Sequence, residues 1–487
     1  MFNATKLTKG VVVALIFAVF FGINSLAGVN YAGPQGAEAA AGNAPKYVFY
    51  FIGDGLGATQ RTVAEYYMQE KNNDPTGKLI MNTFPTFGIN TTYSADTLVT
   101  DSAAAGTALA AGYKTNNGMI AQLPNGTNVK TLVELAEERG MATGLATTTR
   151  LTHATPAAFA AHNPDRDAEN DIAADYVDSG VDYLVGGGYR HFVPKDGALS
   201  SKRTDDRNLV NEFDAEGYQT FISESATDFF KNYVPKAGDK VLGLFSNSHI
   251  PYEIDRVNEN LNVPSIAEMT KKGIDLLSKD QDGFFFMVEG GRIDHACHAN
   301  DIAGTVHDTL AFDAAIKEAV EFYNNHPDET LIVVVGDHET GGMGLGFGTN
   351  YFLNLETVFD DKISVEDILQ SAYKGNRAAF YAYIAENYGL NDLTAVEKAE
   401  IEKAMDIVDK SDSAAAALYG GYDPVAIAVT HIVSERANIF WTTYAHSGTA
   451  IPMSALGVAA EKFAGYKDNT EIAKTMAAVM GFQLGLL

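Results

Sequence analysis

Acidic and imidazole side chains follow directly after several apolar segments of the chain. Asp54, Glu289 and the adjacent pair Asp337 and His338 each stand where an apolar, β-rich run ends. Ligands in open α/β sheets bind beyond the carboxyl ends of the strands, so these side chains are expected to share one crevice. One acid after a strand is ordinarily structural, but several charged groups buried together without a counter-charge would be costly. The pattern therefore predicts a cluster of divalent cations.

Further histidines could complete such a cation site. Asp294 and His298 are four residues apart, so one helical turn would point both side chains the same way. His446 lies in a polar segment and offers another nitrogen. Zinc accepts histidine nitrogen and carboxylate oxygen, and a single cysteine excludes a cysteine-rich zinc site. The isolated histidines are expected to be ordinary structural residues: His162, His191, His249, His307, His326 and His431.

A nucleophile candidate precedes an alanine-rich run at residues 103–105. Ser102 would lie at the N-terminus of the helix that this run predicts, where the helix dipole and free N–H groups favour an anion. The alternative is a simple Asp101 or Ser102 helix cap. Because no general base stands at a triad-like spacing, activation of the serine would have to come from a metal.

Buried strands and amphipathic helices must position these groups. Apolar runs at residues 47–52, 143–148, 284–288 and 331–335 are typical of strands buried on both faces of a parallel sheet. Helical patterns lie between them at residues 129–139, 265–278 and 303–324. This alternation predicts an α/β fold, a three-layer sandwich with a central, mostly parallel sheet flanked by helices.

The amino-acid composition of the chain changes after His338. A glycine-rich stretch at residues 341–348 is followed by a segment at 364–409 rich in Ala, Glu and Lys, which predicts two or three surface helices. Regular structure is expected to resume near residues 424–435. We interpret residues 40–487 as a single α/β domain that carries a largely helical surface insertion at about 341–440.

The N-terminal segment has the features of a signal peptide. Lys6 and Lys9 precede an apolar run at residues 11–21, which is too short for a comfortable transmembrane helix. The A-x-A pattern at 37–39 predicts cleavage before Ala40, which makes residues 1–39 the signal peptide. The protein is then secreted, periplasmic or extracellular, without a stable membrane span. The alternative is an uncleaved N-terminal anchor.

Composition limits the possible partners. The 487 residues include 62 Asp and Glu against 35 Lys and Arg, a formal net charge of −27. This balance argues against a nucleic-acid binder, because neutralising phosphates requires clustered Lys and Arg. With 46% hydrophobic residues, a disordered chain is also excluded. One cysteine cannot form an intramolecular disulfide.

Taken together, these segments resemble alkaline phosphatases. The matching stretches occur in the family's order: FIGDGLG at 51–57, TDSAAAGT at 100–107, HATP at 153–156, VEGGRIDHACH at 288–298, GDHET at 336–340 and HSGT at 446–449. They span about residues 46–480. The resemblance implies a secreted, metal-dependent enzyme that hydrolyses small-molecule phosphate monoesters and releases inorganic phosphate.

The resemblance also implies a role for each matching residue. Ser102 would form a phosphoserine intermediate, and Arg166 would grip two phosphate oxygens. One Zn²⁺ would be held by Asp294, His298 and His446. The second Zn²⁺ would be held by Asp54, Asp337 and His338. A Mg²⁺ would be held by Asp54, Thr155 and Glu289.

Two positions beside the third metal differ among family members. His153 and His295 resemble the branch that carries two histidines, where others carry Asp and Lys. Imidazole favours zinc or cobalt over magnesium, so the third metal could also be Zn²⁺ or Co²⁺. A homodimer is implied by the resemblance alone. The alternatives are a phosphodiesterase or sulfatase on the same metal scaffold, or a non-catalytic exported protein that binds metal or phosphate.

Overall fold

The computed structural model describes residues 44–487, which lie within one compact unit. The predicted signal peptide at residues 1–39 is outside the described residues. Within the described part of the chain, no helix is long and apolar enough to cross a membrane.

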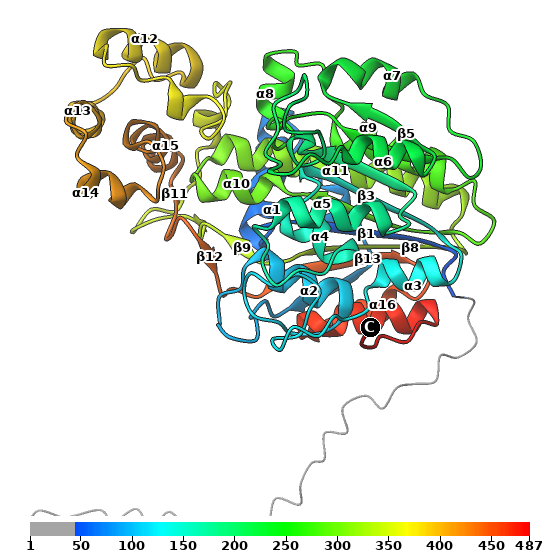
Figure 1. Cartoon of the computed structure of the whole chain (residues 1–487). Coiled ribbons are helices and arrows are strands. Elements are labelled where there is room, and N and C mark those ends of the chain that lie inside the picture. The colour runs from blue at the N-terminus through cyan, green and yellow to red at the C-terminus, as the bar shows by residue number, and fades with distance from the viewer. Residues whose placement is uncertain (1–43) are drawn as a thin grey trace, which may run out of the picture. The chain divides into compact units, whose positions relative to one another are not determined.

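Ten strands form the central sheet, in the order β14-β2-β13-β8-β1-β7-β3-β4-β6-β5 (Figure 1). All neighbouring pairs are parallel except the two that β13 makes with β2 and β8. The strands are β1 Tyr47–Gly53, β2 Thr86–Asn90, β3 Ala142–Arg150, β4 Tyr183–Gly187, β5 Tyr218–Ile222, β6 Lys240–Leu244, β7 Phe284–Gly290, β8 Thr330–Gly336, β13 Ile451–Gly457 and β14 Gly465–Lys467. The mostly parallel sheet is confirmed.

Helices cover both faces of the sheet, and each layer has its own apolar core. The α-helices are α1 Ala58–Lys71, α2 Ser102–Ala111, α3 Leu132–Glu138, α4 Ala154–Ala160, α5 Glu169–Asp178, α6 Leu209–Ala215, α7 Thr227–Asn232, α8 Glu253–Asn258, α9 Ile266–Leu277, α10 Arg292–His298, α11 Ile302–Asn325, α12 Arg377–Tyr388, α13 Ala395–Asp409, α14 Ser413–Ala416, α15 Pro424–Ala437 and α16 Asn469–Met480.

Strand β1 shows how one apolar run serves both cores. Phe49 and Phe51 pack into the core that contains α1, α9 and α11. Their neighbours Tyr50 and Ile52 point to the opposite face and pack with α2, α3 and α16. Successive side chains of a strand alternate between faces, so a strand covered on both sides must be apolar throughout. The three-layer architecture is therefore confirmed.

The predicted elements agree with the structure apart from their ends. The helix expected at 129–139 begins only at Leu132, because Thr131 forms a capping box with Glu134. Val129 instead makes a β-bridge with Leu486. The segment at 364–409 contains α12 and α13, which Figure 1 shows beside the α/β core together with α14 and α15. Residues 341–440 stay a predicted insertion.

Candidate active site

The ends of three neighbouring strands bring the acidic residues together. Strand β1 lies between β7 and β8, and its last residue, Gly53, pairs with Gly290 and Gly336. Asp54 and Asp337 follow these paired glycines and are buried. Glu289 was expected just after its strand but lies within β7, because the pairing extends to Gly290. Its side chain is also buried. The register of the three strands thus brings these acidic residues to one edge of the sheet.

A glycine allows the helix α10 to approach this edge. Gly55 has a φ of +72°, and a side chain there would lie 2.8 Å from the Cα atom of Asp294. Left-handed backbone conformations favour glycine because it has no Cβ atom. The N–H of Gly55 donates to Asp337 Oδ1 at 3.1 Å. The loop therefore packs tightly between two of the candidate ligands.

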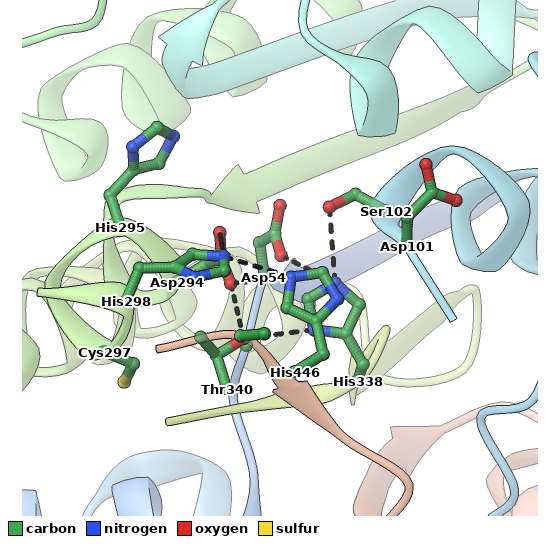
Figure 2. Close-up of polar contacts among 12 residues, drawn as sticks. Asp54, Asp101, Ser102, Asp294, His295, Cys297, His298, His338, Thr340 and His446 are labelled. Atoms are coloured by element: carbon green, nitrogen blue, oxygen red, sulfur yellow. Dashed lines mark hydrogen bonds and ion pairs between the residues drawn. The ribbon is translucent and has the colours of Figure 1, made fainter. Parts of the chain in front are cut away.

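Helix α10 and the short strand β12 (His446–Ser447) supply one group of candidate ligands. His298 Nε2 lies 3.3 Å from Asp294 Oδ2 and 3.1 Å from His446 Nε2. β12 pairs with β9 (Glu339–Thr340), which places His446 opposite Thr340. The predicted helical turn thus points Asp294 and His298 to the same side (Figure 2).

His338 joins this group to a second one. Its Nε2 lies 3.3 Å from Asp54 Oδ1 and 3.2 Å from Asp337 Oδ2. Its ring stacks on His446 with 3.5 Å between ring centroids. Two sets have ligand atoms within 4.8 Å of one another, namely Asp294, His338 and His446, and Asp54, Asp337 and His338. His298 borders the first set and is not one of its three members.

The electrostatics of these groups fit a cation. Burial raises the pKa of Asp337 to about 7, with Asp294 adding to the effect. Burial and the charges of Asp337 and Asp294 likewise raise the pKa of Asp54 well above its usual range. Asp54 Oδ1 and Asp337 Oδ2 are buried without a hydrogen-bond partner among residues 44–487. Since unpaired buried carboxylates are costly, divalent cations at these oxygens would remove the penalty.

His338 is in the state that a cation requires, whereas Asp294 raises the pKa of His298 to about 9 despite its burial. Burial lowers the pKa of His338 well below its usual range, and the charge of His446 acts in the same direction. A neutral imidazole is the form that coordinates metal. Burial alone would raise the pKa of Asp294, but His298 and His446 hold it well below its usual range. The residues present therefore suit zinc, which takes imidazole nitrogen and carboxylate oxygen.

Ser102 opens helix α2 and faces the second group. Asp101 is the N-cap and accepts a hydrogen bond from the N–H of Ala104, so the cap that sequence reasoning weighed as an alternative is present. Ser102 is the first helical residue, and its Oγ lies 3.2 Å from His338 Nε2 (Figure 2). The serine is thus free of the capping role. It sits where the helix terminus favours negative charge.

Asp101 also holds Arg166 in place. Its Nη1 donates to Asp101 Oδ2 at 3.0 Å, and its Nη2 lies 3.2 Å from His153 Nε2. Asp101 also accepts from the N–H of Gly118. The guanidinium is therefore oriented by an acid directly before Ser102. A planar fork of donors fixed in this way suits a phosphate group.

A third group lies between β7 and helix α4. Ligand atoms of Asp54, His153 and Glu289 lie within 4.8 Å of one another. Thr155 Oγ1 donates to Asp54 Oδ2 at 3.5 Å. Burial raises the pKa of Glu289 to about 7, and its Oε1 has no hydrogen-bond partner in the part of the chain that the structure describes. This orphaned oxygen fits a third cation beside the first two groups.

Sequence reasoning missed several residues of this region. Thr149 donates to Glu289 Oε2 at 3.1 Å, and Thr340 hydrogen-bonds Asp294. The ring of His249, expected to be an ordinary histidine, lies 4.3 Å from that of His295. Glu366, which lies in the predicted insertion, is 3.3 Å from His295. Thr340 could have been suspected from its place in the GDHET segment, whereas the others carry no sequence signal.

Comparisons with known proteins agree with this geometry. The family described as "Alkaline phosphatase" matches residues 45–482. Alkaline phosphatase 3 of Bacillus subtilis (strain 168) is 34% identical over 484 residues, which cover 97% of each chain.

Solved structures are also similar to the chain. The cold-active alkaline phosphatase of Shewanella sp. has a TM-score of 0.75 at 31% identity, and the match covers 89% of this chain and 99% of that one. The alkaline phosphatase of Thermus thermophilus has a TM-score of 0.77 at 29% identity, with 92% and 93% covered.

Proposed function

The chain belongs to the alkaline phosphatase family and is a phosphoric monoester hydrolase. We propose that it acts through a phosphoserine intermediate on Ser102. The observation that carries this proposal is the position of Ser102 Oγ, at a helix N-terminus and 3.2 Å from His338 Nε2. A serine held there can attack a phosphate without a conventional general base when a cation lowers its pKa. Arg166, fixed by Asp101, would bind two oxygens of the same phosphate.

The reaction would proceed in two displacements. Ser102 Oγ attacks the phosphorus in line with the ester oxygen, the new P–O bond forms, and the bond to the alcohol breaks. The alcohol leaves with the proton that the Ser102 hydroxyl gives up. Water then attacks the phosphoserine, inorganic phosphate departs, and the Ser102 hydroxyl is restored. Arg166 would keep the phosphate oriented through both steps.

Three cations complete the proposed site. Asp294, His298 and His446 would hold one Zn²⁺, and Asp54, Asp337 and His338 would hold the second. When bound, such a zinc pair supplies charge stabilisation to the attacking and leaving oxygens. This chain's residues supply the ligand atoms: buried carboxylate oxygens without a partner among the described residues, and a neutral His338 whose ring belongs to both ligand sets.

The third cation would be Mg²⁺, held by Asp54, Thr155 and Glu289. The unpartnered Glu289 Oε1 supports a cation there. His153 and His295 lie beside it, with 5.7 Å between their ring centroids. Because imidazole is a softer ligand than carboxylate, Zn²⁺ or Co²⁺ is the alternative occupant.

Export and a homodimer complete the proposal. Export is supported by the two lysines, the apolar run and the A-x-A pattern before residue 40. The homodimer is supported only by the family resemblance. Light scattering of the purified protein would show about twice the chain mass if the homodimer forms.

Ser102→Ala tests the proposed chemistry. Hydrolysis of p-nitrophenyl phosphate should fall by at least about three orders of magnitude. Mass spectrometry after acid quenching should find phosphate on residue 102 of the wild type and none on the variant. Ser265→Ala is a matched control, because Ser265 also stands at a helix N-terminus but caps α9. A Ser102→Ala variant with wild-type activity would contradict the proposal.

A further inference from the structure

Residues of the predicted insertion lie against the first turn of α10. Arg292 opens this helix and is fully buried. Its Nη1 lies 3.2 Å from Glu366 Oε2, and its Nη2 lies 2.5 Å from Asp367 Oδ2. The guanidinium also stacks 3.6 Å from the ring centroid of Tyr252. A buried arginine with two carboxylate partners fixes the insertion to the helix that carries Asp294 and His298.

Glu366 makes two further contacts, with Tyr252 and with His295. Its Oε2 accepts a hydrogen bond from Tyr252 at 2.6 Å and also lies 3.3 Å from His295 Nδ1. A carboxylate only accepts hydrogen bonds, so this contact requires the proton of His295 to be on Nδ1. In the neutral imidazole, the other ring nitrogen, Nε2, then carries a lone pair. That atom is buried and has no hydrogen-bond partner among the described residues.

The surroundings of His295 show what this lone pair can serve. Its ring lies 4.3 Å from that of His249 and 5.7 Å from that of His153. Both ring nitrogens of His249 contact Arg150, so His249 is already engaged. His153 belongs to the third candidate cation group with Asp54 and Glu289. Among the described residues, His295 Nε2 is therefore an acceptor without a partner, on a ring 5.7 Å from that of His153 in this group.

We propose that Glu366 is a positioning residue for the third cation site: it fixes the tautomer of His295 so that Nε2 can accept a hydrogen bond from water bound to the cation. The inference rests on the third site of the proposed function. It assigns the predicted insertion a direct part in that site. Histidines that ligate metals commonly donate their other ring N–H to a carboxylate, and mutation of such outer-shell partners typically weakens metal binding about 10–100-fold.

The test measures cation binding apart from catalysis. Mg²⁺ is titrated by calorimetry into zinc-loaded wild type, Glu366→Ala and Glu366→Gln, with zinc content measured by mass spectrometry. Both Glu366 variants should keep two zinc ions and bind Mg²⁺ about 10–100-fold more weakly. The Gln variant keeps the size of the side chain and serves if the Ala variant does not fold. Asp367→Asn is the matched control, because Asp367 contacts Arg292 but not His295, and it should stay within about twofold of wild type.

A double-mutant cycle separates positioning from general loosening. In a His295→Ala background, Glu366→Gln should weaken Mg²⁺ binding by no more than about twofold further. The inference would be overturned if Asp367→Asn weakened Mg²⁺ binding as much as the Glu366 variants do. It would also be overturned if Glu366→Gln weakened Mg²⁺ binding in the His295→Ala background as much as it does in the wild type. Normal Mg²⁺ affinity in both Glu366 variants would overturn it while leaving the proposed function intact. A wild type that binds no third cation would remove the third site itself, and with it this inference, but not the Ser102 chemistry.

Discussion

A buried aspartate next to the Glu366 segment should make the stability of the protein depend on pH. Asp255, on α8, is 2% exposed and accepts hydrogen bonds from the backbone N–H of Ser364 at 2.7 Å and from its Oγ at 2.5 Å. Burial raises the pKa of Asp255 to about 7, although both hydrogen bonds act to lower it. The folded protein therefore holds this proton more tightly than the unfolded chain does.

The sign and size of the effect follow from proton linkage. A raised pKa in the folded state contributes stability that is fully present below the unfolded pKa of about 3.8 and is lost as pH rises through about 7. The difference between the pKa of about 3.8 in the unfolded chain and about 7 in the folded protein corresponds to about 4 kcal/mol, which is lost at about 1.4 kcal/mol per pH unit. Asp255→Asn removes this titration. Its Oδ1 can still accept from the Ser364 N–H, and the Ser364 hydroxyl can turn to accept from the amide.

The assay is urea unfolding of cation-loaded wild type and Asp255→Asn between pH 5 and 8. The unfolding free energy of the variant should rise relative to wild type by about 3 kcal/mol across this range and stay level above pH 7.5. Taking the difference cancels the other carboxyl groups and the cation sites that both proteins share. Ser364→Ala removes a hydrogen bond that lowers this pKa, so it should move the window to higher pH. A difference that is flat between pH 5 and 7, or that favours wild type as pH rises, would refute the reasoning.

Three other perturbations probe phosphate binding, the cations and the core. Arg166→Ala should lower kcat/KM about 100-fold or more, and Arg166→Lys should recover only part of it because an ammonium lacks the planar fork, as steady-state kinetics would show. Chelation should abolish p-nitrophenyl phosphate hydrolysis and lower Tm, with both restored by zinc and magnesium; an unchanged Tm would count against tightly held structural cations. Phe49→Ala should cost about 3–5 kcal/mol in urea unfolding, because Phe49 is fully buried and packs edge-on against Phe284 at 5.0 Å. Phe229→Ala, with Phe229 73% exposed, should cost under about 0.5 kcal/mol.

The central sheet and much of the candidate site could be predicted because local patterns determine them. A strand buried on both faces carries few charged side chains, which made the apolar runs of β1, β7 and β8 and the threonine-rich run of β3 visible in the sequence. Parallel neighbours end at the same edge, so Asp54 and Asp337 had to be close once their strands were recognised. The four-residue spacing of Asp294 and His298 likewise follows from one helical turn. Their roles as ligands stay proposals.

The residues that orient these groups could not be predicted, because their partners depend on packing between distant segments. Glu366 stands between the apolar residues Val365 and Ile368, which give no sign of its partners, and only the packing of residues 363–367 against α10 brings it to His295 and Arg292. Arg292 itself stands in a polar stretch, where sequence alone favours an exposed charge, yet it is buried between Tyr252 and two acids. A buried cation of this kind is stable only if its partners are in place. The predicted insertion and α10 should therefore become ordered together. A change in residues 363–367 should alter the cation site before it alters the sheet.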